Sequence, residues 1–188
     1  MATSEDLVNQ ALSFLGDDPI VALSDDTERA RLANRLFQPT LDAVLRAHPW
    51  NVAIDRATLT ETTAPVYSWK HKFILPTDNL RILSLNEQEH YADGGDVFKL
   101  ESGFLLTDSS TANIRYIKRI AAPDMDSLLF DATAFRLASA MAYPISGSTS
   151  LSQEMWGLYQ ARLQEARTVD GQEGSPDRTD ITTLTDIR

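Results

Sequence analysis

The sequence has no cysteine among its 188 residues. Disulfide bridges, thiolate metal sites and cysteine nucleophiles are therefore excluded. Also absent is an apolar run of about 20 residues, which a membrane-spanning helix needs. The chain begins MATSEDLVNQ and lacks the basic start of a secretory signal. These absences predict a soluble, cytosolic chain without a membrane segment.

Positive charge is also scarce. Asp and Glu number 27 against 17 Lys and Arg, so the formal net charge is −10. Affinity for DNA of any sequence comes mainly from Lys and Arg that neutralise phosphates. We therefore do not expect the surface as a whole to bind DNA. An acidic wall repels a passing duplex, however, so the charge is compatible with a protein that lines a DNA channel.

Hydrophobic residues make up 43% of the chain, which is ordinary for a globular protein and suits one core. The stretch SEDLVNQALSFLG has apolar residues at helical spacing, with Ser4 as the expected N-cap and Gly16 at the C-terminal end. A second helical stripe follows caps at residues 24–26. Pro39 is expected to kink this helix, and Pro49 to end it at about His48.

The pattern changes after the proline, where Trp50 is expected to plug the junction and WNVAIDRATLTET alternates as an extended segment does. Between residues 66 and 120 the period stays near two, in the runs KFIL, LRILSL, DVFKLES, FLLTD and ANIRYIKRI. DGGD and ESG are expected hairpin turns. Leu105 and Leu106, followed by TDSSTA, predict an edge strand and a loop. We expect antiparallel strands.

Helical spacing returns in MDSLLFDATAFRLASAMAYPI, which Pro144 is expected to stop, and in LSQEMWGLYQARLQEARTVD. The sequence thus predicts an α+β fold, an antiparallel helical bundle built from N- and C-terminal helices with an inserted β-rich domain. The expected parts are 1–48 and 125–169 for the bundle, 49–124 for the β-rich insertion and 170–188 for a tail. The polar tail is expected to be flexible or ordered by a partner.

Motifs for chemistry are few. No phosphate-binding glycine loop or GxSxG elbow occurs, and the three histidines form no compact ligand pair. We therefore expect no catalytic residue, no metal and no cofactor. Two carboxylates in the β-rich part would be needed to hydrolyse a glycoside, and the sequence does not pair the available ones. These acids are Glu61, Glu87, Glu89, Glu101 and Asp108.

Cations alternate with aromatic residues in SWKHKF and RYIKR. Such segments can stack on bases or hold phosphates. Alternation along a strand places the same residues on a solvated face just as readily, so both interpretations stay open. Trp50, Trp69 and Trp156 are likewise candidates for subunit interfaces, where tryptophan is enriched. For Trp50 and Trp156, core packing is an equally open interpretation.

A longer pattern resembles a known family. The stretch from Ala11 to Leu59, with the ALSFLG helix end, the loop of Ile20 and Leu23 and the turn LRAHPWNVA, resembles the N-terminal part of the tail tubular protein A family of short-tailed bacteriophages. FILPTDNLRIL, FLLTD, IRYIKRI and FRLASAMAYPISGS continue the resemblance up to about residue 171. LRAHPWNVA is its most specific piece.

The resemblance implies a structural head-to-tail adaptor of the virion. Such a protein forms a dodecameric ring that docks on the portal protein, receives the tail nozzle below, and surrounds passing double-stranded DNA without sequence-specific binding. No catalytic residue is implied. We expect the Pro49 and Trp50 corner to fix the angle between the bundle and the extended segment. The candidate interface residues are Arg46, Trp50, Lys70, Lys72, Arg115, Arg119, Ile181, Leu184 and Ile187.

Two other functions remain open at this point. A related head-completion family has been credited with cell-wall hydrolysis, so a muramidase activity on the same fold is the main alternative. A nucleic-acid-binding module is the other, and it would require duplex binding with a steep salt dependence.

Overall fold

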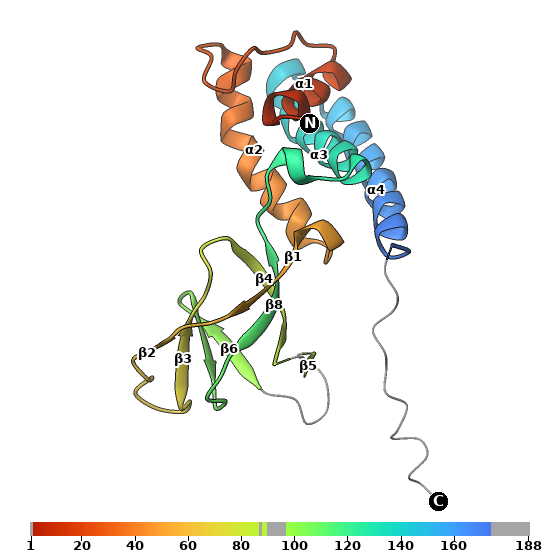
Figure 1. Ribbon diagram of the computed structural model, residues 1–188. Coiled ribbons are helices and arrows are strands. Elements are labelled where there is room, and N and C mark those ends of the chain that lie inside the picture. The colour runs from red at the N-terminus through yellow and green to blue at the C-terminus, as the bar shows by residue number, and fades with distance from the viewer. Residues whose placement is uncertain (1, 87, 90–96, 174–188) are drawn as a thin grey trace, which may run out of the picture.

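The computed structural model describes residues 2–86, 88–89 and 97–173. It contains a helical bundle and, between the second and third helices of the chain, two antiparallel sheets (Figure 1). This arrangement confirms the predicted α+β class. None of the helices in the described ranges is long and apolar enough to cross a membrane. The predicted tail residues Ile181, Leu184 and Ile187 lie outside the described residues.

Four helices make the bundle. They are α1 (Ser4–Leu15), α2 (Glu28–Arg46), α3 (Ser127–Ser146) and α4 (Thr149–Asp170). α3 lies in the middle and packs against the other three. It is buried on nearly every side, and its many alanines let the neighbouring helices approach closely. The alanine-rich stretch of the sequence is therefore the centre of the bundle.

The helix ends follow local chemistry. Thr3 caps α1, because its Oγ1 accepts the Asp6 amide at 3.1 Å while the Asp6 carboxylate accepts the Thr3 amide at 2.7 Å. The prediction of Ser4 as N-cap was wrong by one residue, since this reciprocal pair needs the acid three positions after the cap. The predicted C-terminal glycine is confirmed, as Gly16 has a φ of 71°. Thr27, rather than residues 24–26, caps α2.

Contrary to the prediction, proline does not interrupt these helices. α2 is continuous through Pro39, and α3 includes Pro144 in its last turn. The prediction that Pro144 stops the third helix was wrong. Each proline removes one backbone donor, a loss that tertiary packing of the apolar face outweighs. α3 ends at Ser146, and Gly147, with a φ of 68°, is its C-cap.

The sheets have four strands each. The first, in spatial order, is β1 (Ile54–Thr58), β8 (Asn113–Lys118), β4 (Asn79–Leu85) and β5 (Gln88–Glu89). The second is β2 (Glu61–Thr62), β3 (His71–Ile74), β7 (Phe104–Thr107) and β6 (Phe98–Glu101). Every strand pair is antiparallel, as predicted.

Both sheets contribute to one small core of their own. Its buried members are Leu59, Phe73, Ile82, Leu85, Phe98, Leu105, Ala112, Ile114 and Tyr116. The prediction that Leu105 and Leu106 form an edge strand was wrong, because β7 lies between β3 and β6. Both side chains are buried although they point to opposite faces, which is typical of an interior strand covered on both sides.

The predicted ESG turn joins β6 to β7. Ser102 and Gly103 have φ angles of 50° and 82°, so both central residues are left-handed, as a tight two-residue hairpin requires. The second predicted turn, DGGD, falls on residues 93–96, outside the described residues.

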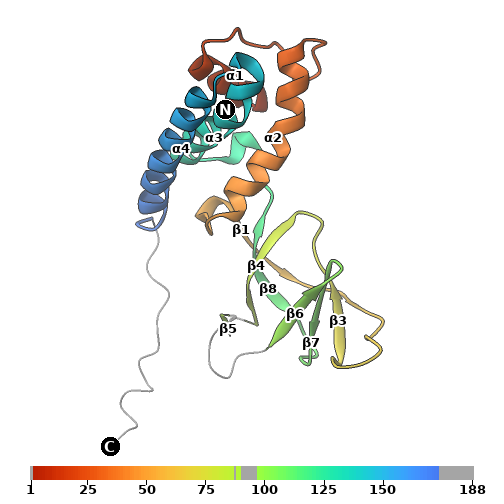
Figure 2. The same cartoon turned by 180° about the vertical axis from the view of Figure 1, so that it is seen from behind.

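The bundle and the sheets share a boundary. Leu80, Ile117 and Ile120, from the first sheet and the segment after it, belong to the hydrophobic core of the bundle. Figures 1 and 2 show the β-rich part beyond the end of α2, on the side away from the N-terminus. The two parts are therefore packed directly against each other where α2 passes into β1.

Candidate functional site at the joint between bundle and sheets

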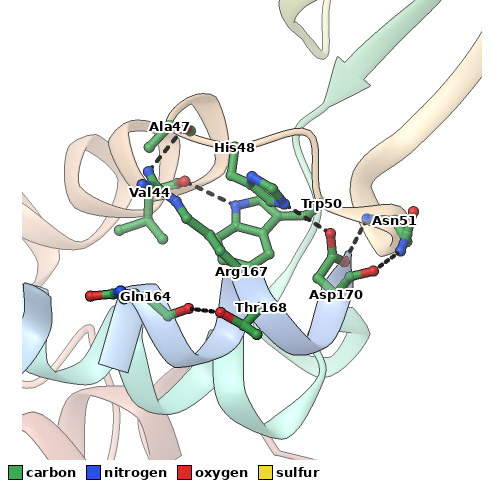
Figure 3. Close-up of polar contacts among 9 residues, drawn as sticks. All are labelled: Val44, Ala47, His48, Trp50, Asn51, Gln164, Arg167, Thr168 and Asp170. Atoms are coloured by element: carbon green, nitrogen blue, oxygen red, sulfur yellow. Dashed lines mark hydrogen bonds and ion pairs between the residues drawn. The ribbon is translucent and has the colours of Figure 1, made fainter. Parts of the chain in front are cut away.

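The chain turns sharply between the bundle and the first sheet. α2 ends at Arg46 with Ala47 as its cap, and a 3-10 helix, η1 (Asn51–Ala53), leads into β1. The prediction that Pro49 ends the helix near His48 is confirmed. We call residues 47–53 together with Asp170 the joint; Figure 3 shows most of it.

Trp50 fills the centre of the joint. Its side chain is fully buried in the core of the bundle, and its Nε1 donates a hydrogen bond to the carbonyl of Val44 at 3.1 Å. The His48 ring meets the indole edge to face, with 4.7 Å between ring centroids. The predicted role of Trp50 as a plug is confirmed. Its role as a surface anchor was wrong, since its own chain encloses the side chain.

Asp170, the last residue of α4, connects this helix to residues 47–53 (Figure 3). One carboxylate oxygen accepts the Asn51 amide at 2.9 Å, and the other lies 3.0 Å from Nε2 of His48. The Asn51 side chain donates back to the Asp170 carbonyl at 2.7 Å. Asp170 is 7% exposed, so these bonds are shielded from water. They tie residues about 120 positions apart into one unit.

Sequence reasoning missed Asp170, although one signal was present. A helix C-terminus carries partial negative charge, so an acid in the last position is unfavourable without a donor nearby. Arg167, one turn earlier, strengthens the same connection by donating to the Ala47 carbonyl at 3.1 Å. An acid as the last residue of a helix, such as Asp170, therefore indicates that another segment supplies hydrogen-bond donors to it.

A second connection joins α2 to the end of β8. The Arg119 guanidinium binds Asp42 with two parallel hydrogen bonds, of 2.7 Å from Nε and 2.6 Å from Nη2. This pairing holds the pKa of the Asp42 carboxyl below its ordinary value. Arg46 also crosses the boundary, since its guanidinium donates to the Leu80 carbonyl on β4. Two of the predicted interface residues, Arg46 and Arg119, thus hold the chain's own parts together.

The Asp42 carboxyl has a lowered pKa in the folded chain, so the pair stabilises the fold above the ordinary carboxyl pKa. This contribution is lost as the pH falls through the lowered value. We expect Arg119→Gln to cost about 1 kcal/mol at pH 7 and progressively less below about pH 4. Urea unfolding of both proteins at several pH values measures this, and a cost that does not change with pH would contradict it.

The other predicted cations do not form one patch. Lys72, on β3, places its Nζ 3.9 Å above the centre of the Phe104 ring. Lys70 is exposed just before β3, and its backbone amide donates to Asp108 at 3.0 Å. Arg115 lies in the other sheet, on β8 between β1 and β4. The cation and aromatic segments therefore lie on separate sheets instead of lining one groove for nucleic acid.

The carboxylates weighed for glycoside hydrolysis are also spread out. Glu61, on β2, pairs with His71 at 2.7 Å. Glu101, on β6, pairs with Lys99 at 2.7 Å. These are the two edge strands of the second sheet, so three strand spacings, about 14 Å, separate them. Glycosidase carboxyls lie about 5–9.5 Å apart. The side chains of Glu87 and Glu89 lie outside the described residues.

Comparison of the chain with protein-family models and with curated proteins gave no match.

Proposed function

We propose that this chain is a structural subunit of a phage head-to-tail connector, similar to tail tubular protein A. In this function it forms a dodecameric ring between the portal protein and the tail nozzle, in the virion. Double-stranded DNA passes through the ring without sequence-specific binding. The chain acts as a mechanical link and does no covalent chemistry.

The observation that carries the proposal is the joint. LRAHPWNVA is the most specific part of the resemblance, and it folds into the corner where α2, α4 and the first sheet are connected. A connector subunit must hold two bodies at a fixed angle, because one meets the portal while the other meets a neighbour or the nozzle. Burial of Trp50 and the bonds of Asp170 supply that rigidity.

The charge also supports this function. A net charge of −10 disfavours strong binding of DNA phosphates, so DNA would not adhere to the wall of a channel built from this chain. Several cations on the sheet side are already neutralised within the chain. Lys118 pairs with Asp55 at 2.9 Å, next to the pair of Arg119 with Asp42.

Electron microscopy of the protein mixed with the portal ring of the same phage tests the proposal directly. We expect a second ring stacked coaxially on the portal, and no such density with the portal alone. The protein by itself, at the same concentration, is the second control. Bare portals beside dispersed protein, at concentrations well above micromolar, would contradict the connector function.

In that event the muramidase alternative is tested by clearing of a suspension of purified cell walls. Activity would have to fall on changing an acid of the β-rich part, such as Glu61→Gln. Since Glu61 and Glu101 lie on opposite edge strands, we expect no clearing from the native protein.

A further inference from the structure

A groove runs between α3 and α4, which lie side by side in Figures 1 and 2. It forms an open, shallow hollow of about 270 Å³ lined by Arg136, Ser139, Ser152, Gln153 and Trp156. We call these five residues the α3–α4 groove. Trp156, at the rim of this hollow, is 44% exposed, although tryptophan is highly buried on average.

Arg136 is the distinctive residue of the groove. Its guanidinium carbon lies 4.7 Å from the centre of the Trp156 ring and 5.8 Å from that of Tyr159. One N–H donates to Ser139 Oγ at 3.3 Å, out of the five donors that a guanidinium carries. The pair of aromatic rings fixes the orientation of the side chain, so little rotamer entropy remains to be lost on binding.

Arg136 forms no ion pair with any carboxylate in the part of the chain that the structure describes, whereas Arg162 on α4 is paired with Asp131 and Glu165. An arginine held beside an open cavity and exposed indole suits a carboxylate followed by an apolar side chain. The chemistry of the groove therefore suits a segment in which an acid directly precedes an apolar residue.

Such a segment exists in the chain itself. Residues 174–188 read GSPDRTDITTLTDIR, where Asp180 directly precedes Ile181, Asp186 directly precedes Ile187, and Leu184 lies between the two pairs. Trp156 lies about 21 Å back along α4 from its last residue, at 1.5 Å per helical residue. A chain that turns back after residue 173 covers this distance with about seven extended residues. Asp180 is the seventh residue after Glu173, so Asp180 and Ile181 are the first acid and apolar pair of this segment at the required distance.

We infer that the α3–α4 groove binds the C-terminal segment of the same chain, with the Asp180 carboxylate on Arg136 and Ile181 against Trp156. Leu184 then lies near the start of α4. This contact covers the exposed indole and satisfies the arginine. It is independent of the proposed connector function, because it is made within one chain.

Binding of a fluorescein-labelled peptide of residues 174–188, followed by anisotropy, tests the inference. The peptide is titrated into the full chain and into a chain that ends at Glu173. Among the residues that the structure describes, both hydrophobic cores consist of residues no later than Ala166, so the shortened chain retains them. We expect the peptide to bind the shortened chain at least tenfold more tightly than the full chain, whose own segment occupies the groove.

Variants locate the binding site. Arg136→Gln in the shortened chain should weaken peptide binding at least tenfold, since an Arg and carboxylate contact is lost. Arg35→Gln, an exposed arginine on α2 with the same charge change, should leave it within twofold. A peptide with Asp180→Asn and Ile181→Ser should bind weakly to the unchanged protein, so this arm does not depend on the folding of any variant.

Three results would overturn the inference. The peptide would bind neither chain, or it would bind the full and the shortened chain equally, as expected of a site filled by another copy. In the third case, the peptide would bind the Arg136→Gln protein as tightly as its parent while melting temperatures agree. Ring formation on the portal is a separate measurement, so failure here leaves the connector function standing.

Discussion

Replacing Trp50 with alanine is expected to lower the free energy of unfolding by about 3–5 kcal/mol, the range for large aromatic residues removed from a core. Trp50 is the largest fully buried side chain, and its loss leaves a cavity where α2 passes into the first sheet. The Val44 carbonyl also loses its indole donor. Urea unfolding followed by circular dichroism measures the change.

Trp50→Phe is the matched control. It retains an aromatic ring and much of the volume but lacks the donor to Val44, so we expect a smaller loss of about 1–2 kcal/mol. If the alanine variant kept its melting temperature and failed only to form rings, Trp50 would be an interface residue after all. That result would contradict the complete burial of its side chain.

Asp170→Ala is expected to have the next largest effect, about 3 kcal/mol. The carboxylate accepts hydrogen bonds from the Asn51 amide and from His48, and it is nearly inaccessible to water. Without the carboxylate, these buried donors have neither a protein acceptor nor water to bond to. The free-energy cost of a buried donor without a partner exceeds the net contribution of one hydrogen bond to stability. Amide hydrogen exchange should show faster exchange at Asn51, because α4 no longer holds the corner.

Thr168→Ala is the control for Asp170, as it lies in the same last turn of α4. Within residues 2–86, 88–89 and 97–173, its hydroxyl bonds only to the Gln164 carbonyl of the same helix, at 2.9 Å, so we expect a change within about 0.5 kcal/mol. Equal effects of the two alanine variants would mean that the end of α4 acts through helix stability alone. The proposed fastening of α4 to the joint would then be wrong.

Local order was predictable from the sequence. Apolar spacing of 3.6 or 2 residues locates each helix and most strands, because a segment must bury one face to persist. Pro49 and Gly16 end their helices through backbone geometry that needs no partner. The ESG hairpin follows equally from the φ angles that glycine permits. These features depend on neighbours within about four positions.

The sequence was less informative where two local rules compete. It placed a stop at Pro144, yet α3 continues to Ser146, since burial of its apolar faces outweighs one missing backbone bond. It made β7 an edge strand, although β3 and β6, which both come before β7 in the chain, pair with it on its two sides, and Leu105 and Leu106 are buried. In both cases packing decided between alternatives of similar local energy.

The sequence by itself thus determined the α+β class, the order of helices and strands, and a corner at Pro49 and Trp50. Only the tertiary structure brought Asp170 to Asn51, paired Arg119 with Asp42, and left Arg136 beside Trp156 without an acid from the described residues. The physical reason is range. Periodicity and turn chemistry act between near neighbours, whereas a hydrogen bond across about 120 residues exists only after two separate segments have packed together.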